Sequence, residues 1–400
     1  MLEIFSQISA NKKVFIAIPL GIVFFSNIAI TQIKGLVFIG ELAVIGGFCN
    51  LVAILIGLRT DIQILSQSKC NAQHNLSEGI SAMLCLILIS FPCILLGYYL
   101  GAKIEHIIIG FLSTAIALNE ITSSFFLRAS QFYFYSLLRS LPSILILLIV
   151  LYVDSPAKSW IICYSAMLIV LTCILYKEFK RAGISLNISF KPIAIYIKSK
   201  ILPTLTALIC ATGSVFWLFT VSEKVGPEAA GIWSNAIRIF SLPIILMTAI
   251  HLPLVILKVG NLDSSFQKIK VMHKFTYKFF LLSSLILITS FYWGENIFSF
   301  FTATDGAISS SILLMIVGFC ILKNFLGYHQ SIFQALKIDH ILFFILFLEL
   351  LFAIFLYFSN ALVSLSYISN FIFLSVLGCS FLLTIFLFKF TFQYRISDPK

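Results

Sequence analysis

Apolar stretches of about 20 residues follow one another along almost the whole chain, and they constrain its fold more than any other feature. A helix needs roughly 20 apolar residues to cross the hydrocarbon core of a bilayer. Hydrophobic residues occupy 60% of the 400 positions and charged residues only 11%, with a mean hydropathy of +1.06. A soluble protein of this length could not bury so much apolar surface, so we expect the chain to fold in lipid. A barrel would alternate in polarity along strands of about ten residues, and the sequence has no such pattern.

About twelve segments qualify as transmembrane helices, which predicts an all-α membrane protein. The expected spans cover residues 14–33, 36–58, 79–101, 106–127, 131–153, 158–176, 199–221, 229–257, 275–293, 308–329, 339–359 and 366–389. The charged segment KEFKRAGISLNISFK, near residue 185, divides them into two groups of six. We therefore predict two six-helix lobes, residues 1–185 and residues 186–400. The longer connections, 59–78, 177–198 and 258–274, are interpreted as loops.

The distribution of lysine and arginine predicts the orientation of the spans. With the N-terminus in the cytoplasm, the outward loops contain only Lys34, Lys103, Lys158 and Lys224, while most of the 27 basic residues fall on the inner side. Both termini are therefore expected in the cytoplasm. The net charge of +11 then favours contact with the anionic lipids of the inner leaflet rather than with nucleic acid.

Five ionisable residues stand out inside the expected spans, where each costs about 2.5–3.5 kcal/mol on insertion scales. They are Glu120, Arg139, Arg238, Lys323 and Glu349. Glu120 and Arg139 lie equally far from the turn between their spans, and so do Lys323 and Glu349 in the other half. We therefore expect two ion pairs. Each pair either lets its charges survive in a packed bundle or switches when its carboxylate is protonated, while Lys323 has the further option of snorkelling to the helix end.

Arg238 lies near the middle of its span, and no acidic residue shares its depth on the two neighbouring spans. Ser234, Asn235 and Ser241 lie about one turn away, so one face of this helix is polar. A guanidinium group at this depth suits a phosphate or a carboxylate, which it binds through two N–H groups. The alternative is an arginine satisfied by water or by backbone carbonyls.

The sequence lacks the motifs of the common catalytic and metal-binding sites. It has no GxxxxGK[ST], HExxH or GxSxG motif and no Cys/His metal constellation. The nine cysteines form no CxxC pair and lie mostly inside apolar runs, so we interpret them as small hydrophobic residues. We therefore expect no enzymatic activity, no metal and no cofactor, and the sequence favours secondary transport.

Two stretches resemble the Wzx-type flippases, which move undecaprenyl-pyrophosphate-linked oligosaccharides. VGPEAAGIWSNAIRIFSLPIILMTAIHLPLVIL is similar to their eighth span, most clearly at Gly231-Ile232-Trp233. GFCILKNFLGYHQSIFQALKIDHILFFILFLELLFAIFLYF is similar to spans 10 and 11 of the lipid III flippase, and the matching residues are Leu322-Lys323, Gly327-Tyr328, Lys337 and Glu349. That flippase has an acid three positions before the lysine, where this chain has Cys320. Glu349 is therefore the better candidate partner for Lys323.

The resemblance implies the MOP/MATE-like fold, in which two six-helix lobes surround a cavity that opens alternately to each side. It also implies a flippase for an O-antigen or related polysaccharide repeat unit in the bacterial inner membrane, acting in lipopolysaccharide biosynthesis. The expected partners are the undecaprenyl-pyrophosphate-linked oligosaccharide, membrane lipids, H⁺ or Na⁺ as the coupling ion, and a polysaccharide polymerase. The predicted substrate-binding residues are Arg238, Lys323, Arg139 and Asn235, and the predicted coupling acids are Glu120 and Glu349.

Two other functions remain as alternatives. A cation-coupled multidrug exporter of the same fold would favour an acidic or aromatic cavity, whereas three of the five ionisable residues singled out above are basic. A membrane glycan polymerase or transferase would need a long surface loop with paired carboxylates or Arg/His clusters, which the sequence does not contain.

Overall fold

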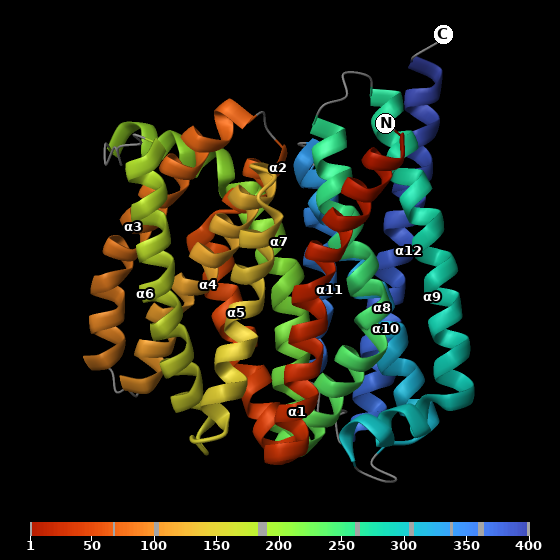
Figure 1. The fold of residues 1–400 in the computed structure, drawn as a ribbon. Coiled ribbons are helices and arrows are strands. Elements are labelled where there is room, and N and C mark those ends of the chain that lie inside the picture. Colours follow the sequence, from red (N-terminus) through yellow and green to blue (C-terminus); the bar gives the residue numbers. More distant parts are fainter. Residues whose placement is uncertain are drawn as a thin grey trace. The chain divides into compact units, whose positions relative to one another are not determined.

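The computed structural model describes residues 2–66, 69–99, 104–182, 190–260, 265–303, 308–336, 339–358 and 364–397, and their regular structure is helical throughout (Figure 1). The helices are α1 (Leu2–Gly57), α2 (Thr60–Ser66), α3 (Lys69–Tyr99), α4 (Ile104–Arg128), α5 (Phe132–Val150), α6 (Pro156–Ala182), α7 (Phe190–Lys224), α8 (Pro227–Gly260), α9 (Ser265–Thr302), α10 (Ser310–Leu336), α11 (Asp339–Phe358) and α12 (Leu365–Ser397).

Nine helices in the described residues are long and apolar enough to cross a membrane. One of them, Val14–Gly57, contains two of the expected spans, because α1 is broken at Gly35, where φ is 81° and ψ is 177°. This backbone conformation is open almost only to glycine. The break lies where the sequence predicts the boundary between two spans. Two further expected spans correspond to the shorter apolar helices His74–Ile89 and Leu342–Phe355.

The predicted loop over residues 59–78 is wrong, because most of this segment is helical. Leu58 and Arg59 have positive φ values of 50° and 52° and turn the chain out of α1. The seven residues of α2 follow at once, and α3 begins at Lys69. A helix as short as α2, with Asp61 in its first turn, does not have the apolar length that marks a span. The other two predicted loops are also shorter than expected, because the ends of α6 to α9 extend into them.

The chain divides into two compact units. Unit 1 consists of Met1–Asn27 and Ile45–Leu208, and unit 2 consists of Ile28–Val44 and Ile209–Lys400. The part of α1 around the Gly35 break therefore belongs to unit 2, and the first half of α7, up to Leu208, belongs to unit 1. The predicted lobes, 1–185 and 186–400, stay a prediction.

Within unit 1, α4 is the central helix and packs against α2, α3, α5 and α6. Its buried side chains are unusually polar for a helix in lipid, and they include Ser113, Thr114, Asn119, Thr122, Ser123 and Ser124. Polar side chains in a membrane belong between helices, where neighbouring groups can bond to them. The polarity of α4 is therefore consistent with its central position.

Within unit 2, α10 is the central helix and packs against α8, α9, α11 and α12. The segment Ile28–Val44 of α1 meets the start of α8 with the two backbones in contact. A Cβ atom on Gly40 would overlap the carbonyl oxygen of Pro227 and lie 2.8 Å from the amide nitrogen of Gly231. A Cβ atom on Gly231 would overlap the carbonyl oxygen of Leu36. Glycine at both positions therefore permits an approach that any other residue would prevent.

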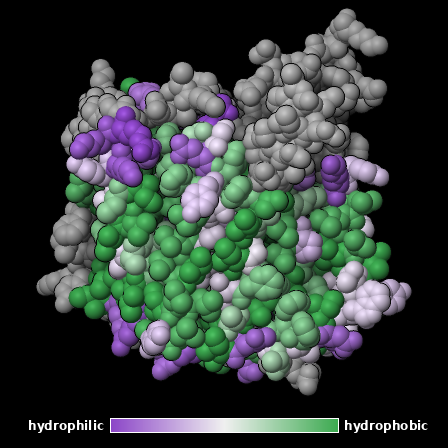
Figure 2. Space-filling model, in the orientation of Figure 1, coloured by the Kyte–Doolittle hydropathy of each residue, from purple (hydrophilic) through white to green (hydrophobic). Residues whose placement is uncertain are grey.

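Large apolar side chains are exposed on many of the helices. Phe25, Ile169, Leu281 and Phe355 are each about two thirds exposed, at 67%, 66%, 66% and 69%. Hydrophobic side chains cover most of the coloured part of the face seen in Figure 2. Such exposure is costly in water but not against lipid tails, so these side chains form a surface suited to a membrane.

Candidate substrate cavity and ion pairs

Unit 2 contains a cavity of about 510 Å³, lined mainly by α7, α8 and α10. Two cations reach it, Arg238 from α8 and Lys323 from α10. Its other polar side chains are Ser214, Ser234, Ser241, Thr248, Asn324 and Tyr328. The rest of the wall is mostly apolar and includes Trp233 and Phe319, whose rings lie 5.4 Å apart. The cavity therefore combines positive charge with an apolar and aromatic surface.

Arg238 is half-buried, and its Nη1 atom is enclosed without a hydrogen-bond partner among the described residues. No carboxylate in the described part of the chain forms an ion pair with it. An enclosed N–H group without a partner costs free energy, and a charged group costs more than a neutral one. The side chain is therefore ready to donate hydrogen bonds to an anion in the cavity.

Lys323 is satisfied within the protein, in contrast to Arg238. Its Nζ lies 2.7 Å from Oε1 of Glu349, and it donates to Oε2 of Glu349 at 2.9 Å and to the backbone carbonyl of Cys210 at 3.4 Å. Lys323 is 8% exposed and Glu349 is 2% exposed. Lys323 contributes to the cavity lining, whereas Glu349 is not among the lining residues. This geometry favours the ion-pair interpretation of Lys323 over snorkelling.

Gly213 of α7 lies next to the Lys323–Glu349 pair and has no side chain that would crowd it. A Cβ atom at this position would lie 3.0 Å from the Nζ of Lys323 and 3.2 Å from Oε1 of Glu349. Cys210, whose carbonyl oxygen accepts from Lys323, lies one turn earlier on the same face of α7. The pair therefore lies directly against the backbone of α7, and a side chain at this position would have to push its charged groups aside by a few tenths of an ångström.

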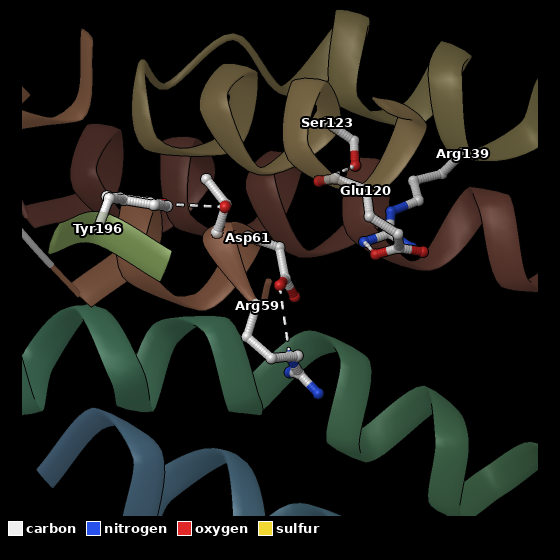
Figure 3. Close-up of polar contacts among 7 residues, drawn as sticks. Arg59, Asp61, Glu120, Ser123, Arg139 and Tyr196 are labelled. Atoms are coloured by element: carbon white, nitrogen blue, oxygen red, sulfur yellow. Dashed lines mark hydrogen bonds and ion pairs between the residues drawn. The ribbon is translucent and has the colours of Figure 1, made fainter. Parts of the chain in front are cut away.

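In unit 1, Arg139 of α5 forms a two-pronged pair with Glu120 of α4 (Figure 3). The Nη1 and Nη2 groups of Arg139 donate to the two carboxylate oxygens of Glu120, the arrangement in which arginine binds a carboxylate most specifically. The guanidinium carbon also lies 5.8 Å from the centre of the Tyr135 ring. The two side chains are 29% and 38% exposed, so this pair is less buried than the one in unit 2.

A second, smaller cavity of about 230 Å³ lies beside this pair in unit 1. Glu120 lines it together with Asn50, Arg59 and Asp61, and Nε of Arg59 lies 3.4 Å from Oδ1 of Asp61 (Figure 3). Sequence reasoning missed Arg59 and Asp61 because it assigned them to a loop. The available signal was the pair Thr60-Asp61, since threonine and acidic residues are favoured at helix N-termini.

The structure brings two of the four predicted substrate-binding residues, Arg238 and Lys323, to one cavity. Arg139 lies in unit 1, paired with Glu120. Asn235 is 2% exposed and is not among the residues that line the cavity in unit 2, and its Oδ1 accepts a hydrogen bond from Thr31 at 3.3 Å. The binding and coupling roles assigned to all of these residues stay predictions.

Solved structures of MATE and MOP superfamily transporters have the same fold. The structure reported under the words "reverse polarity of binding pocket suggests different function of a MOP superfamily transporter from Pyrococcus furiosus" matches with a TM-score of 0.67 at 14% identity, covering 97% of this chain and 96% of that one. The inward-facing and outward-facing conformations of a multidrug resistance MATE family transporter both match with a TM-score of 0.65. The inward-facing structure is 13% identical, and the match covers 98% of this chain and 99% of that one. The outward-facing structure is 14% identical, and the match covers 97% of this chain and 96% of that one.

No family model and no curated protein sequence matches the chain. The predicted fold class, an all-α membrane protein with the MOP/MATE-like fold, is confirmed by the structural likeness. The narrower resemblance to Wzx-type flippases stays a prediction, because identities of 13–14% carry the fold alone. The chain is a multi-pass helical membrane protein with the fold of the MATE and MOP superfamily transporters.

Proposed function

We propose that the protein is a flippase that moves an undecaprenyl-pyrophosphate-linked oligosaccharide repeat unit, of O-antigen or a related surface polysaccharide, across the bacterial inner membrane by alternating access. The fold supports the transport class, and the cationic cavity of unit 2 supports an anionic cargo. In this proposal both chain termini lie in the cytoplasm, and H⁺ or Na⁺ supplies the coupling.

The observation that carries the proposal is the enclosed Nη1 of Arg238, which has no hydrogen-bond partner among the described residues. A pyrophosphate group offers several oxygens to a planar guanidinium, which binds phosphate through two parallel N–H groups. Most of the remaining wall is apolar, and an apolar wall can contact the C–H surface of a sugar. The cavity thus has a group for the charged part of the cargo and a surface for its glycan.

A multidrug exporter for cationic compounds fits the cavity less well, because Arg238 and Lys323 would repel such a cargo. Moreover, no acidic side chain is among the residues that line it. A polymerase or transferase is likewise not favoured by any group of described residues in the cavity, whose polar members are hydroxyls, an amide, an arginine and a lysine.

The test is replacement of Arg238 by alanine and by lysine in the native host, with the chromosomal copy deleted. We expect Arg238→Ala to abolish surface glycan and to cause lipid-linked repeat units to accumulate. Arg238→Lys should retain only part of the surface glycan, because lysine cannot bind a phosphate through two parallel N–H groups. Arg181→Ala is the matched control, since Arg181 is 65% exposed and pairs only with Glu178 among the described residues. Normal surface glycan in Arg238→Ala, at a normal protein level, would refute the role of Arg238.

A drug-susceptibility assay on the same strains separates the exporter alternative. The flippase proposal expects that deletion of the protein leaves resistance to cationic drugs unchanged while surface glycan is lost. The opposite pattern, in which drug resistance is lost and surface glycan stays intact, would refute the flippase function and support the exporter function.

A further inference from the structure

We propose that the cargo anion displaces Glu349 from Lys323, and that Glu349 afterwards retakes Lys323 and so helps to expel the cargo. Glu349 is then an internal competitor of the cargo rather than a binding residue. This inference rests on the proposed function of the unit 2 cavity as an anion site, and it assigns the release step of that same site.

The positions of the three charged groups are the basis of the proposal. Arg238 and Lys323 both line the cavity, on helices α8 and α10 that pack against each other. Arg238 has an N–H group without a hydrogen-bond partner among the described residues, whereas Lys323 already contacts both carboxylate oxygens of Glu349. An anion therefore meets one available cation and one cation that it has to share with a carboxylate.

Exchange of partners is cheaper for Lys323 than simple loss of a partner. A buried ammonium without a counter-charge is strongly disfavoured, so Lys323 leaves Glu349 only when another anion replaces it. A pyrophosphate carries enough charge and enough oxygens to contact Arg238 and Lys323 together. Lys323 can turn between the two anions while the backbone carbonyl of Cys210 remains a third acceptor nearby.

The surroundings of Glu349 favour its return to Lys323. Glu349 is 2% exposed, and Lys323 is the cation that pairs with it among the described residues. Gly213 has no side chain to crowd the carboxylate and the ammonium, which lie side by side 2.7 Å apart against α7. A transporter has to bind its cargo and also release it, and a carboxylate of the protein that competes for Lys323 shortens the time for which the cargo is held.

The experiment measures anion binding by the purified full-length protein in lipid nanodiscs. Inorganic pyrophosphate and farnesyl pyrophosphate are titrated calorimetrically into the wild type and into Glu349→Gln. We expect Glu349→Gln to bind inorganic pyrophosphate about tenfold more tightly, because the amide competes less for Lys323. In cells, the same variant should deliver less surface glycan despite this tighter binding, a combination that a merely structural defect would not produce.

A double-mutant cycle tests whether the effect passes through Lys323. Glu349→Gln should leave pyrophosphate affinity unchanged in a Lys323→Gln background, because no ammonium is left to compete for. Glu223→Gln is the matched control, since Glu223 is also on unit 2 but lies outside the cavity lining and accepts from Tyr357 at 2.5 Å. If Glu349→Gln folds poorly, Glu349→Asp, whose shorter side chain weakens the grip on Lys323, should tighten binding by a smaller factor.

Each outcome decides a separate point. Equal affinity in the wild type, Glu349→Gln and Glu349→Asp would overturn the competitor role, even if Arg238→Ala loses pyrophosphate binding and so leaves the proposed function intact. Undiminished pyrophosphate binding by Arg238→Ala would instead remove the anion site on which the proposed function depends. If farnesyl pyrophosphate binds at least as tightly as inorganic pyrophosphate, the result supports a lipid-linked cargo. If the protein binds inorganic pyrophosphate but not farnesyl pyrophosphate, a lipid-linked cargo is ruled out.

Discussion

The ammonium of Lys323 contacts both carboxylate oxygens of Glu349, at 2.7 Å and 2.9 Å, in a region where both side chains are almost completely buried. The two charges neutralise each other, so neither needs water at this depth. The folded protein is nevertheless stable only with both residues present or both absent, because either one alone would be a buried charge without a counter-charge.

The stability of the fold should therefore respond differently to single and double replacements of this pair. We expect Lys323→Met to lower the free energy of unfolding by about 3–5 kcal/mol, because it leaves the Glu349 carboxylate buried and unpaired. The double variant Lys323→Met with Glu349→Met should cost less than either single change. Unfolding of the purified protein in detergent measures all three, and a double variant less stable than both single variants would contradict the expectation.

The Glu120–Arg139 pair of unit 1 should be sensitive to geometry as well as to charge. Replacing Arg139 by alanine removes two charge-assisted hydrogen bonds, and we expect a loss of about 1.5–3 kcal/mol. Arg139→Lys should recover part of it, because lysine keeps the charge but donates from a single point. Thermal unfolding compares these variants with Arg181→Ala, which breaks an exposed pair and should change stability by at most about 1 kcal/mol. A fully stable Arg139→Ala would refute the structural value of the pair.

The close approach of α1 and α8 in unit 2 predicts that Gly40 tolerates no side chain. A methyl group there would overlap the carbonyl oxygen of Pro227, and backbone atoms cannot move aside as a flexible side chain can. We expect Gly40→Ala to lower the free energy of unfolding by about 1–3 kcal/mol. Gly378→Ala is the control in the same unit, since a Cβ there meets nothing within 4 Å and alanine favours the helix by up to about 1 kcal/mol. Equal stability of the two variants would count against the contact.

The break in α1 predicts a different kind of sensitivity at Gly35. A Cβ at Gly35 meets nothing within 4 Å, so any cost of Gly35→Ala comes from its φ of 81° rather than from a clash. We expect a loss of about 1–3 kcal/mol. Gly21→Ala, in the same helix with equally open surroundings, should be neutral or slightly stabilising. Thermal midpoints of the two purified variants provide the comparison, and a stable Gly35→Ala would show that the break shifts easily along α1.

The ion pairs could be anticipated from the sequence because helices convert residue number into depth. The partners of each pair lie equally far from a turn, and a rise of about 1.5 Å per residue then places them at the same level. The break at Gly35 could be anticipated for a related reason, since the long apolar run exceeds one membrane crossing. These predictions depend on spacing along the chain, which the folded structure preserves.

The cavity wall and the charges of α2 could not be predicted in this way. Trp233 and Phe319 line a cavity, but every span is apolar on most sides, so their sequence context does not distinguish them from lipid-facing aromatics. The short helix α2 is held by contacts from far along the chain, such as the 2.9 Å hydrogen bond between Thr60 and Tyr196. Partners so distant in sequence leave no local pattern.

The contact between Gly40 and α8 also sets an order of events during biosynthesis. Ile28–Val44 belongs to unit 2, whose remaining residues begin only at Ile209. When this segment leaves the ribosome, the glycine surface of α8 that it will touch has not yet been translated. Unit 2 therefore cannot fold from one contiguous piece of nascent chain. Its first segment, Ile28–Val44, enters the membrane before Gly231 is synthesised and can make this contact only afterwards.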